Sequence, residues 1–188
     1  MRESIAHLKQ AYPNIACTFS FTDEYETWRD QDVAMLDFLE LHCWMTGFSD
    51  FYEQMDYHFE EFDPKDYNKL QKRAESLYRS DPAKWQASLG RGIDQMAEWS
   101  RFSGKPLMTT ECWGVVNYKD WPLLNWDWIK ELCEIGVRRA ASTGRWAAMA
   151  TSNFCGPQFV GMWRDADWHR RLTDIIHQAK LPTATLGG

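Results

Sequence analysis

The chain has 188 residues, a formal net charge of -6 at pH 7 and eleven tryptophans. This length is enough for one domain with its own core. The acidic balance and the absence of a Lys/Arg cluster from the sequence exclude a nucleic-acid partner of the usual phosphate-tracking kind. No stretch of the sequence approaches the length of a membrane-spanning helix, and residues 1–12 are polar rather than signal-peptide-like. We therefore expect a soluble chain without a membrane partner, cytoplasmic if its N-terminus is native.

The aromatic content, 15 % of the residues, is the unusual part of the composition. Flat aromatic faces are surfaces on which sugar rings stack, although a tryptophan-rich core explains any single tryptophan equally well. The five cysteines are odd in number, scattered and without metal-ligand spacing, so we expect reduced thiols that mostly pack. The sequence also contains no P-loop, dinucleotide-binding glycine motif or serine nucleophile elbow. It implies neither a cofactor nor a metal.

The first part of the chain is expected to alternate helix and strand. Residues 4–12 have the amphipathic pattern of a helix. The β-branched and aromatic run 15–21 and the apolar run 36–44 (LDFLELHCW) predict two strands. The segment 46–64 that follows is long, acidic and aromatic, and we expect a loop there.

The second part repeats this alternation with longer helices. Residues 66–102 have a helical pattern that restarts at Ser80-Asp81-Pro82 and ends at Gly104. The remaining expected elements are a strand over 106–113 (PLMTTECW), a helix around 129–140, a strand over 146–154 and a final helix over 168–179, capped by Asp165.

The element order indicates the fold class. A helix followed by four strand-plus-helix units predicts an α/β fold with about four parallel strands and covering helices. No repeat, low-complexity tract or linker divides the sequence, so residues 1–188 are expected to form a single domain. Loops at the carboxyl ends of parallel strands are where such folds place their chemistry.

The sharpest candidate for chemistry is the segment 104–114 (GKPLMTTECWG), an apolar strand that ends on Glu111 and continues with an aromatic residue. A helix, then Gly-Lys-Pro, an apolar strand and a terminal Thr-Glu resembles the seventh strand of the retaining cellulase-like (β/α)8-barrel glycoside hydrolases. The resemblance implies that Glu111 is the catalytic nucleophile. An ordinary carboxylate at a strand end is the competing interpretation.

The resemblance extends over nearly all of the chain. Residues 37–44 are similar to the sixth strand of that family, which often ends in a histidine followed by an aromatic residue. Residues 15–21 and 146–154 would then be the fifth and eighth strands. The implied sugar-binding residues are His42, Trp44, Trp113, Asn153 and Phe154, with the three aromatic residues as stacking platforms. A histidine hydrogen-bonded in the core explains His42 equally well, and Trp99, Trp128 and Trp168 fit helix stripes and are expected in the core.

The family's general acid has no counterpart in the sequence. That acid follows an Asn at the end of the fourth strand, and the chain contains no Asn-Glu dipeptide. Glu40 shares the inward face of its strand with His42 but lies about one layer, roughly 6 to 7 Å, below the strand end, so we expect a polar core residue tied to its neighbours. Asp23, Asp50, Glu53 and Asp56 lie in expected loops and are more typical of a solvated acidic surface than of hydroxyl ligands.

Three hypotheses follow. The first is the C-terminal half, strands five to eight, of a (β/α)8-barrel hydrolase of β-glycans or β-glycosides, since a complete barrel takes about 250 residues. The second is a non-catalytic carbohydrate-binding or structural half barrel, and the third is a different small α/β fold. A half barrel exposes strand edges and an apolar inner face, so we expect either self-association or an N-terminal half barrel as its partner.

Overall fold

The computed structural model describes residues 2–22, 26–58, 64–115, 125–152 and 164–181. Within these residues, no helix combines the length and the apolar character needed to cross a membrane.

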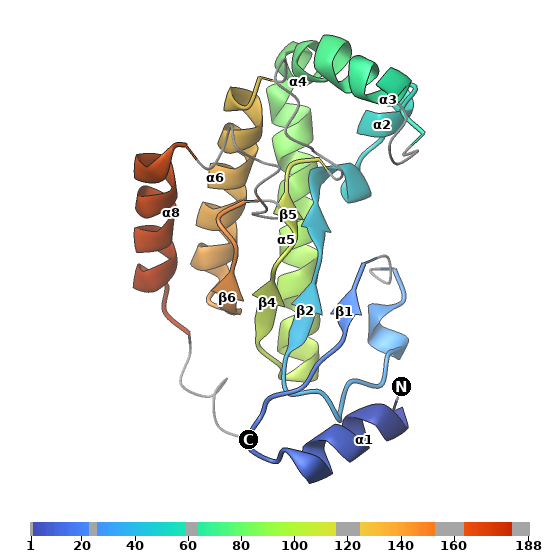
Figure 1. The fold of residues 1–188 in the computed structure, drawn as a ribbon, viewed down its shortest axis with the longest axis vertical. Coiled ribbons are helices and arrows are strands. Elements are labelled where there is room, and N and C mark those ends of the chain that lie inside the picture. Colours follow the sequence, from blue (N-terminus) through green and yellow to red (C-terminus); the bar gives the residue numbers. More distant parts are fainter. Residues whose placement is uncertain (1, 23–25, 59–63, 116–124, 153–163, 182–188) are drawn as a thin grey trace.

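Four parallel strands form one sheet in the order β1 (Ser20–Phe21), β2 (Leu39–Leu41), β4 (Leu107–Thr109) and β6 (Trp146–Met149). A second parallel pair, β3 (Cys43–Trp44) and β5 (Cys112–Trp113), continues the course of β2 and β4 (Figure 1). The spatial order of these four strands follows the chain, and each parallel neighbour is reached by a crossover connection. The predicted α/β fold with four parallel strands and covering helices is confirmed, and this arrangement is that of a partial (β/α)8 barrel.

The observed strands are shorter than the predicted ones. The run 36–44 is interrupted at His42, and the run 106–113 is interrupted at Thr110 and Glu111. In the run 15–21 only the last two residues form a strand, because the Thr18 hydroxyl donates to the Phe38 carbonyl at 2.6 Å and so competes with the ladder. Both interruptions in the centre of the sheet therefore fall on the residues that the sequence marks as candidates for chemistry.

The helices cover one face of the sheet. Figure 1 shows α5 (Pro82–Ser103) running behind the strands, α6 (Asp127–Thr143) and α8 (Ala166–Gln178) beside it, and α1 (Arg2–Ala11) at the foot of the sheet. The predicted caps are present: Asp81 and Asp165 accept hydrogen bonds from the backbone N–H groups of Lys84 and Trp168, each at 3.1 Å. Gly104 ends α5 with φ of 73°.

The expected loop after residue 46 contains helical structure. The 3₁₀ turn η2 (Met45–Phe48) and the short helix α2 (Phe51–Gln54) lie in it. The helix α3 (Pro64–Lys69), the π-helical stretch η3 (Leu70–Ala74) and the helix α4 (Glu75–Ser80) follow. Another 3₁₀ turn, η1 (Trp28–Asp30), lies earlier in the chain, before β2. The acidic composition of this segment suggested a solvated loop, but Phe51, Met55 and Tyr57 are 5 % exposed or less. Burial of these apolar side chains orders the segment.

Tryptophans build the core. The nine tryptophans among the described residues are all 9 % exposed or less, and eight of them, all except Trp44, belong to the contiguous hydrophobic core. Those predicted on helix stripes, Trp99, Trp128 and Trp168, are confirmed as core residues. The high aromatic content is thus explained mainly by packing between the sheet and the helices.

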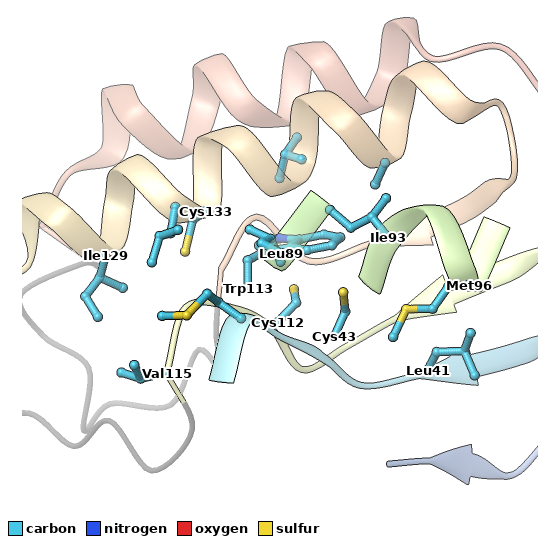
Figure 2. Close-up of a cluster of buried hydrophobic side chains, with 14 of the residues drawn as sticks. Leu41, Cys43, Leu89, Ile93, Met96, Cys112, Trp113, Val115, Ile129 and Cys133 are labelled. Carbon is cyan, nitrogen blue, oxygen red and sulfur yellow. The ribbon is translucent and has the colours of Figure 1, made fainter. Parts of the chain in front are cut away.

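Trp113 is one of these core residues. It has no exposed surface, and its indole Nε1 donates to the Ala150 carbonyl at 3.2 Å. Figure 2 shows its ring among apolar side chains from the sheet and the covering helices. An indole with no exposed face has no surface to offer to a sugar ring, so the prediction of Trp113 as a stacking platform is wrong. The ring fills space that the missing side chain of Gly136 leaves on α6.

Alanine at Gly136 is expected to destabilise the protein. Glycine to alanine inside a helix usually stabilises by about 0.5–1 kcal/mol. Here the new Cβ would lie 2.5 Å from Trp113 Cδ2, against a ring that is buried and hydrogen-bonded. Such overpacking costs about 1–3 kcal/mol, so Gly136→Ala should lower the free energy of unfolding, as measured by urea denaturation.

Gly90→Ala is the matched control in α5. Its Cβ would meet the guanidinium carbon of Arg139 at 3.2 Å, at the end of a side chain that is 47 % exposed and able to move. We expect a neutral or stabilising change of about 0.5–1 kcal/mol. Equal stabilisation by both substitutions would contradict the close packing of Trp113 on α6.

Candidate active site

Glu111 and His42 lie side by side at the carboxyl ends of the two central strands. His42 follows β2, and Glu111 follows β4. The Oε2 atom of Glu111 lies 3.3 Å from Nδ1 of His42. The Glu111 side chain is 29 % exposed and the His42 side chain 14 %, so both are partly buried but reachable from solvent. The structure therefore brings together the predicted nucleophile and the predicted histidine of the sugar site.

A β-bulge places Glu111 at this position. Glu40 is the register partner of Met108, and Cys43 is the register partner of Cys112. Between these two pairs the chain of β2 and β3 has two residues, 41 and 42, whereas the chain of β4 and β5 has three, 109–111. The strand that carries Glu111 therefore has one extra residue. A bulge of this kind redirects a side chain and frees backbone groups from the ladder, and such bulges are frequent next to active sites.

Glu40 occupies the layer below His42, as the strand alternation predicts. Its side chain is 6 % exposed, and Oε1 accepts hydrogen bonds from the Thr110 backbone N–H at 3.0 Å and from the Thr110 hydroxyl at 2.7 Å. Its Oε2 lies 3.4 Å from Nε2 of His42. Glu40 is thus a polar core residue tied to its neighbours, and those neighbours belong to the site.

His42 lies between two carboxylates. One ring nitrogen faces Glu111 and the other faces Glu40. An imidazole donates from both nitrogens only as the imidazolium, and a neutral ring donates from one. The main chain of His42 is fixed as well, because its N–H donates to the Phe21 carbonyl at 3.0 Å. The His42 ring is therefore positioned from three strands: Phe21 on β1 holds its main chain, and Glu40 on β2 and Glu111 after β4 face its two nitrogens.

The other predicted site residues differ in their placement. Trp44 ends β3, is 8 % exposed, and by alternation lies on the same face as Glu40 and His42. Trp113 is in the core, as described above. Asn153 and Phe154 lie outside the described residues, and so does Asp23.

Two acidic residues of the segment after β3, Asp50 and Asp56, are paired with lysines. Asp50 accepts a hydrogen bond from Lys84 at 2.8 Å, and this contact lowers the pKa of its carboxyl group. A hydrogen bond from Lys69 likewise lowers the pKa of Asp56, whose Oδ2 lies 3.1 Å from the Lys69 ammonium group. These two carboxylates have structural partners, which supports the interpretation of a solvated acidic surface.

The exposed face of the sheet carries a cavity that sequence reasoning missed. A hollow of about 370 Å³ lies between β4 and β6. Its lining is mostly small or apolar: Met108, Thr109, Thr110, Ala148, Met149, Ala150 and Ser152. The signal available in the sequence was the number of small residues in 147–152 (AAMATS), since small side chains on a strand leave room beside the neighbouring strand.

Metal-ligand groups and reactive thiols would be two further sources of chemistry among the described residues. The described residues contain no group of three His, Cys, Asp or Glu side chains that could hold a metal ion. Cys43 and Cys112 follow His42 and Glu111 directly, but both are completely buried, and burial raises the pKa of the Cys43 thiol far above its ordinary value. A buried, protonated thiol is a packing group rather than a nucleophile.

The fold and the arrangement of Glu111, His42 and Glu40 at the strand ends agree with a cellulase-like class of protein. The chain belongs to the sugar-binding cellulase-like family, whose model matches residues 1–177. It is also similar to the crystal structure of a candidate glycoside hydrolase from Parabacteroides distasonis, with 46 % sequence identity and a TM-score of 0.91. That match covers 98 % of this chain and 49 % of the other, so the chain spans about half the length of that protein. None of the curated proteins matches the chain.

Proposed function

We propose that this chain carries the nucleophile half of a retaining glycoside hydrolase site, with Glu111 as the nucleophile and β-glycans or β-glycosides as substrates. The observation that carries the proposal is the sheltered but accessible Glu111 carboxylate beside His42 at the strand ends. A nucleophile needs this combination of a fixed position and an open approach. Membership of the cellulase-like family supports the same class of reaction.

The reaction proceeds in two displacements. Glu111 attacks the anomeric carbon, the glycosidic C–O bond breaks, and the leaving oxygen takes a proton from a general acid roughly 5 to 5.5 Å away from the nucleophile. The same acid, now a base, takes a proton from a water molecule that attacks the anomeric carbon and releases Glu111 with overall retention. We expect this acid to come from the part of the barrel that completes the four strands, since the sequence has no Asn-Glu dipeptide.

The sugar is expected to lie over the strand ends. Trp44 shares its face with His42 and does not belong to the contiguous hydrophobic core of the described residues, so it remains the best candidate for stacking. His42 is placed to contact a sugar hydroxyl next to the reacting carbon. Asn153 and Phe154 are retained as binding candidates from the sequence alone.

The face of the sheet opposite the helices is open among the described residues. Thr110 and Ala148 are exposed on it, and β1 and β6 are edge strands among the described residues. Four strands do not close a barrel, so we propose that strands from a complementary half barrel or from a second copy cover this face. Multi-angle light scattering of the isolated 188-residue chain should report an assembly larger than one chain; a stable monomer across concentrations would count against this proposal.

The nucleophile is tested by covalent labelling of the chain. Dinitrophenyl 2-fluoro-β-glycosides carry a leaving group that departs without protonation, so they report on the nucleophile even when the general acid is missing. We expect intact-mass analysis to show one added 2-fluoroglycosyl group, and peptide mapping to place it on Glu111. A panel of glucoside, mannoside and cellobioside reagents covers different sugar preferences.

The alternatives give different results. Labelling at another carboxylate would reassign the nucleophile. Absence of labelling with every reagent, together with measurable binding of a β-glycan oligosaccharide, would replace the hydrolase proposal with that of a carbohydrate-binding half barrel.

A further inference from the structure

Glu40 is a buried carboxylate in a position where the fold does not require one. Its residue is 5 % exposed, and its strand neighbours Leu39 and Leu41 have no exposed surface. Burying a charged group in such surroundings carries a desolvation penalty that a leucine would avoid. Residues that break a local folding rule in this way are often found at functional sites.

The two oxygens of Glu40 contact both supports of Glu111. Oε1 accepts from the backbone N–H and the hydroxyl of Thr110, the bulge residue directly before Glu111. Oε2 is buried and makes no hydrogen bond of good geometry within the described residues, but it lies 3.4 Å from the ring nitrogen of His42 that faces away from Glu111. One side chain therefore holds the backbone that carries Glu111 and faces the imidazole beside its carboxylate.

We propose that Glu40 is the positioning residue of the site: through Thr110 it fixes the bulge, and through His42 it orients the ring that faces Glu111. This inference rests on the proposed role of Glu111 as the nucleophile. Glu40 does not touch the substrate in this scheme. It acts because a carboxylate is able to accept from two donors on one oxygen and still present the other oxygen to the imidazole.

The test separates the two contacts of Glu40. Glu40→Gln keeps an oxygen for Thr110 but places an amide in front of His42, whereas Thr110→Val removes only the hydroxyl donor to Glu40. We expect each substitution to lower the rate constant for labelling by the dinitrophenyl 2-fluoro-β-glycosides by about 10- to 100-fold, the scale of a small misplacement of a reacting group. The conservative variant Thr110→Ser keeps both donors and should restore the rate that Thr110→Val loses.

Two further readouts distinguish positioning from a general loss of structure. Glu40→Gln should alter the pH profile of the labelling rate and the ¹⁵N chemical shift of His42 Nε2, because it replaces the charged oxygen facing that atom. Leu172→Ala, a buried position on α8, is the control: it should reduce thermal stability without changing the labelling rate or the His42 resonance.

The outcomes are separable from those of the proposed function. If the unsubstituted chain is not labelled, the nucleophile proposal fails, while the His42 resonance in Glu40→Gln still decides whether Glu40 orients the ring. If the chain is labelled and Glu40→Gln leaves rate, pH profile and resonance unchanged, the positioning role of Glu40 is overturned.

Discussion

Glu111→Ala is expected to abolish covalent labelling and to lower hydrolysis of dinitrophenyl β-glycosides by a factor on the order of 10⁴ or more, the scale seen when a hydrolase loses its nucleophile and keeps its other groups. The reason is that the remaining groups bind and orient the sugar but form no bond to the anomeric carbon. The release of dinitrophenolate, followed by absorbance, measures the loss. The same loss should appear in any assembly that completes the barrel.

Azide provides a specific test of the vacated position. In Glu111→Ala a small anion fits the space that the carboxylate leaves, attacks the anomeric carbon and expels dinitrophenolate. We expect azide to restore dinitrophenolate release and to give a glycosyl azide of inverted, α, configuration. Two results would argue against a nucleophile at this position: formation of a β-glycosyl azide, or no recovery of dinitrophenolate release with any small anion.

Glu134→Gln is the matched control for this experiment. Glu134 lies on α6 and pairs with Arg138 one helical turn away, at 2.7 Å. An exposed helix pair of this kind contributes little to stability. Labelling and hydrolysis by Glu134→Gln should equal those of the unsubstituted chain.

The second large effect is expected from Trp128→Ala. The Trp128 side chain is 1 % exposed, stacks on Phe51 with ring centroids 5.9 Å apart, and lies 5.4 Å from the ring of Tyr78. Trp128 therefore joins α6 to α2 through Phe51 and to α4 through Tyr78. Replacing a buried tryptophan by alanine leaves a large cavity and costs about 3–5 kcal/mol of the free energy of unfolding. Urea denaturation at one fixed protein concentration measures this change, because association affects apparent stability.

Two variants accompany this measurement. Trp128→Phe keeps an aromatic ring in the cluster and should lose clearly less than Trp128→Ala. Phe102→Ala removes an aromatic side chain that is 65 % exposed and should change the free energy of unfolding by about 0.5 kcal/mol or less. Equal losses in Trp128→Ala and Phe102→Ala would mean that the tryptophans do not build the core in the way that their burial indicates.

The order of elements could be predicted because it is written in local patterns. The restart of the helix at Asp81-Pro82, the cap at Asp165 and the stripe on α6 depend on residues a few positions apart, and the structure confirms them. The proximity of His42 and Glu111 could also be predicted from the sequence, since the carboxyl ends of neighbouring parallel strands meet at one edge of the sheet.

Other features depend on contacts between distant residues. Trp113 follows a strand end, which suggested an exposed ring, but the space beside Gly136 on α6 decides that it is buried. The segment after β3 is acidic and was expected to be a loop, but the aromatic cluster around Trp128 orders part of it. No pattern within either segment carries this information, because the free energy comes from surfaces that meet only on folding.

By itself the sequence determined the alternation of helix and strand, the parallel sheet and the position of Glu111 at a strand end, because periodicity, caps and strand termini are local properties. Only the tertiary structure decided the register, in which one extra residue before Cys112 forms the bulge, ties Thr110 to Glu40 and places His42 between two carboxylates. Register depends on how two strands pair across about 70 residues of chain. That pairing is fixed by how the sheet packs against its covering helices and not by either strand alone.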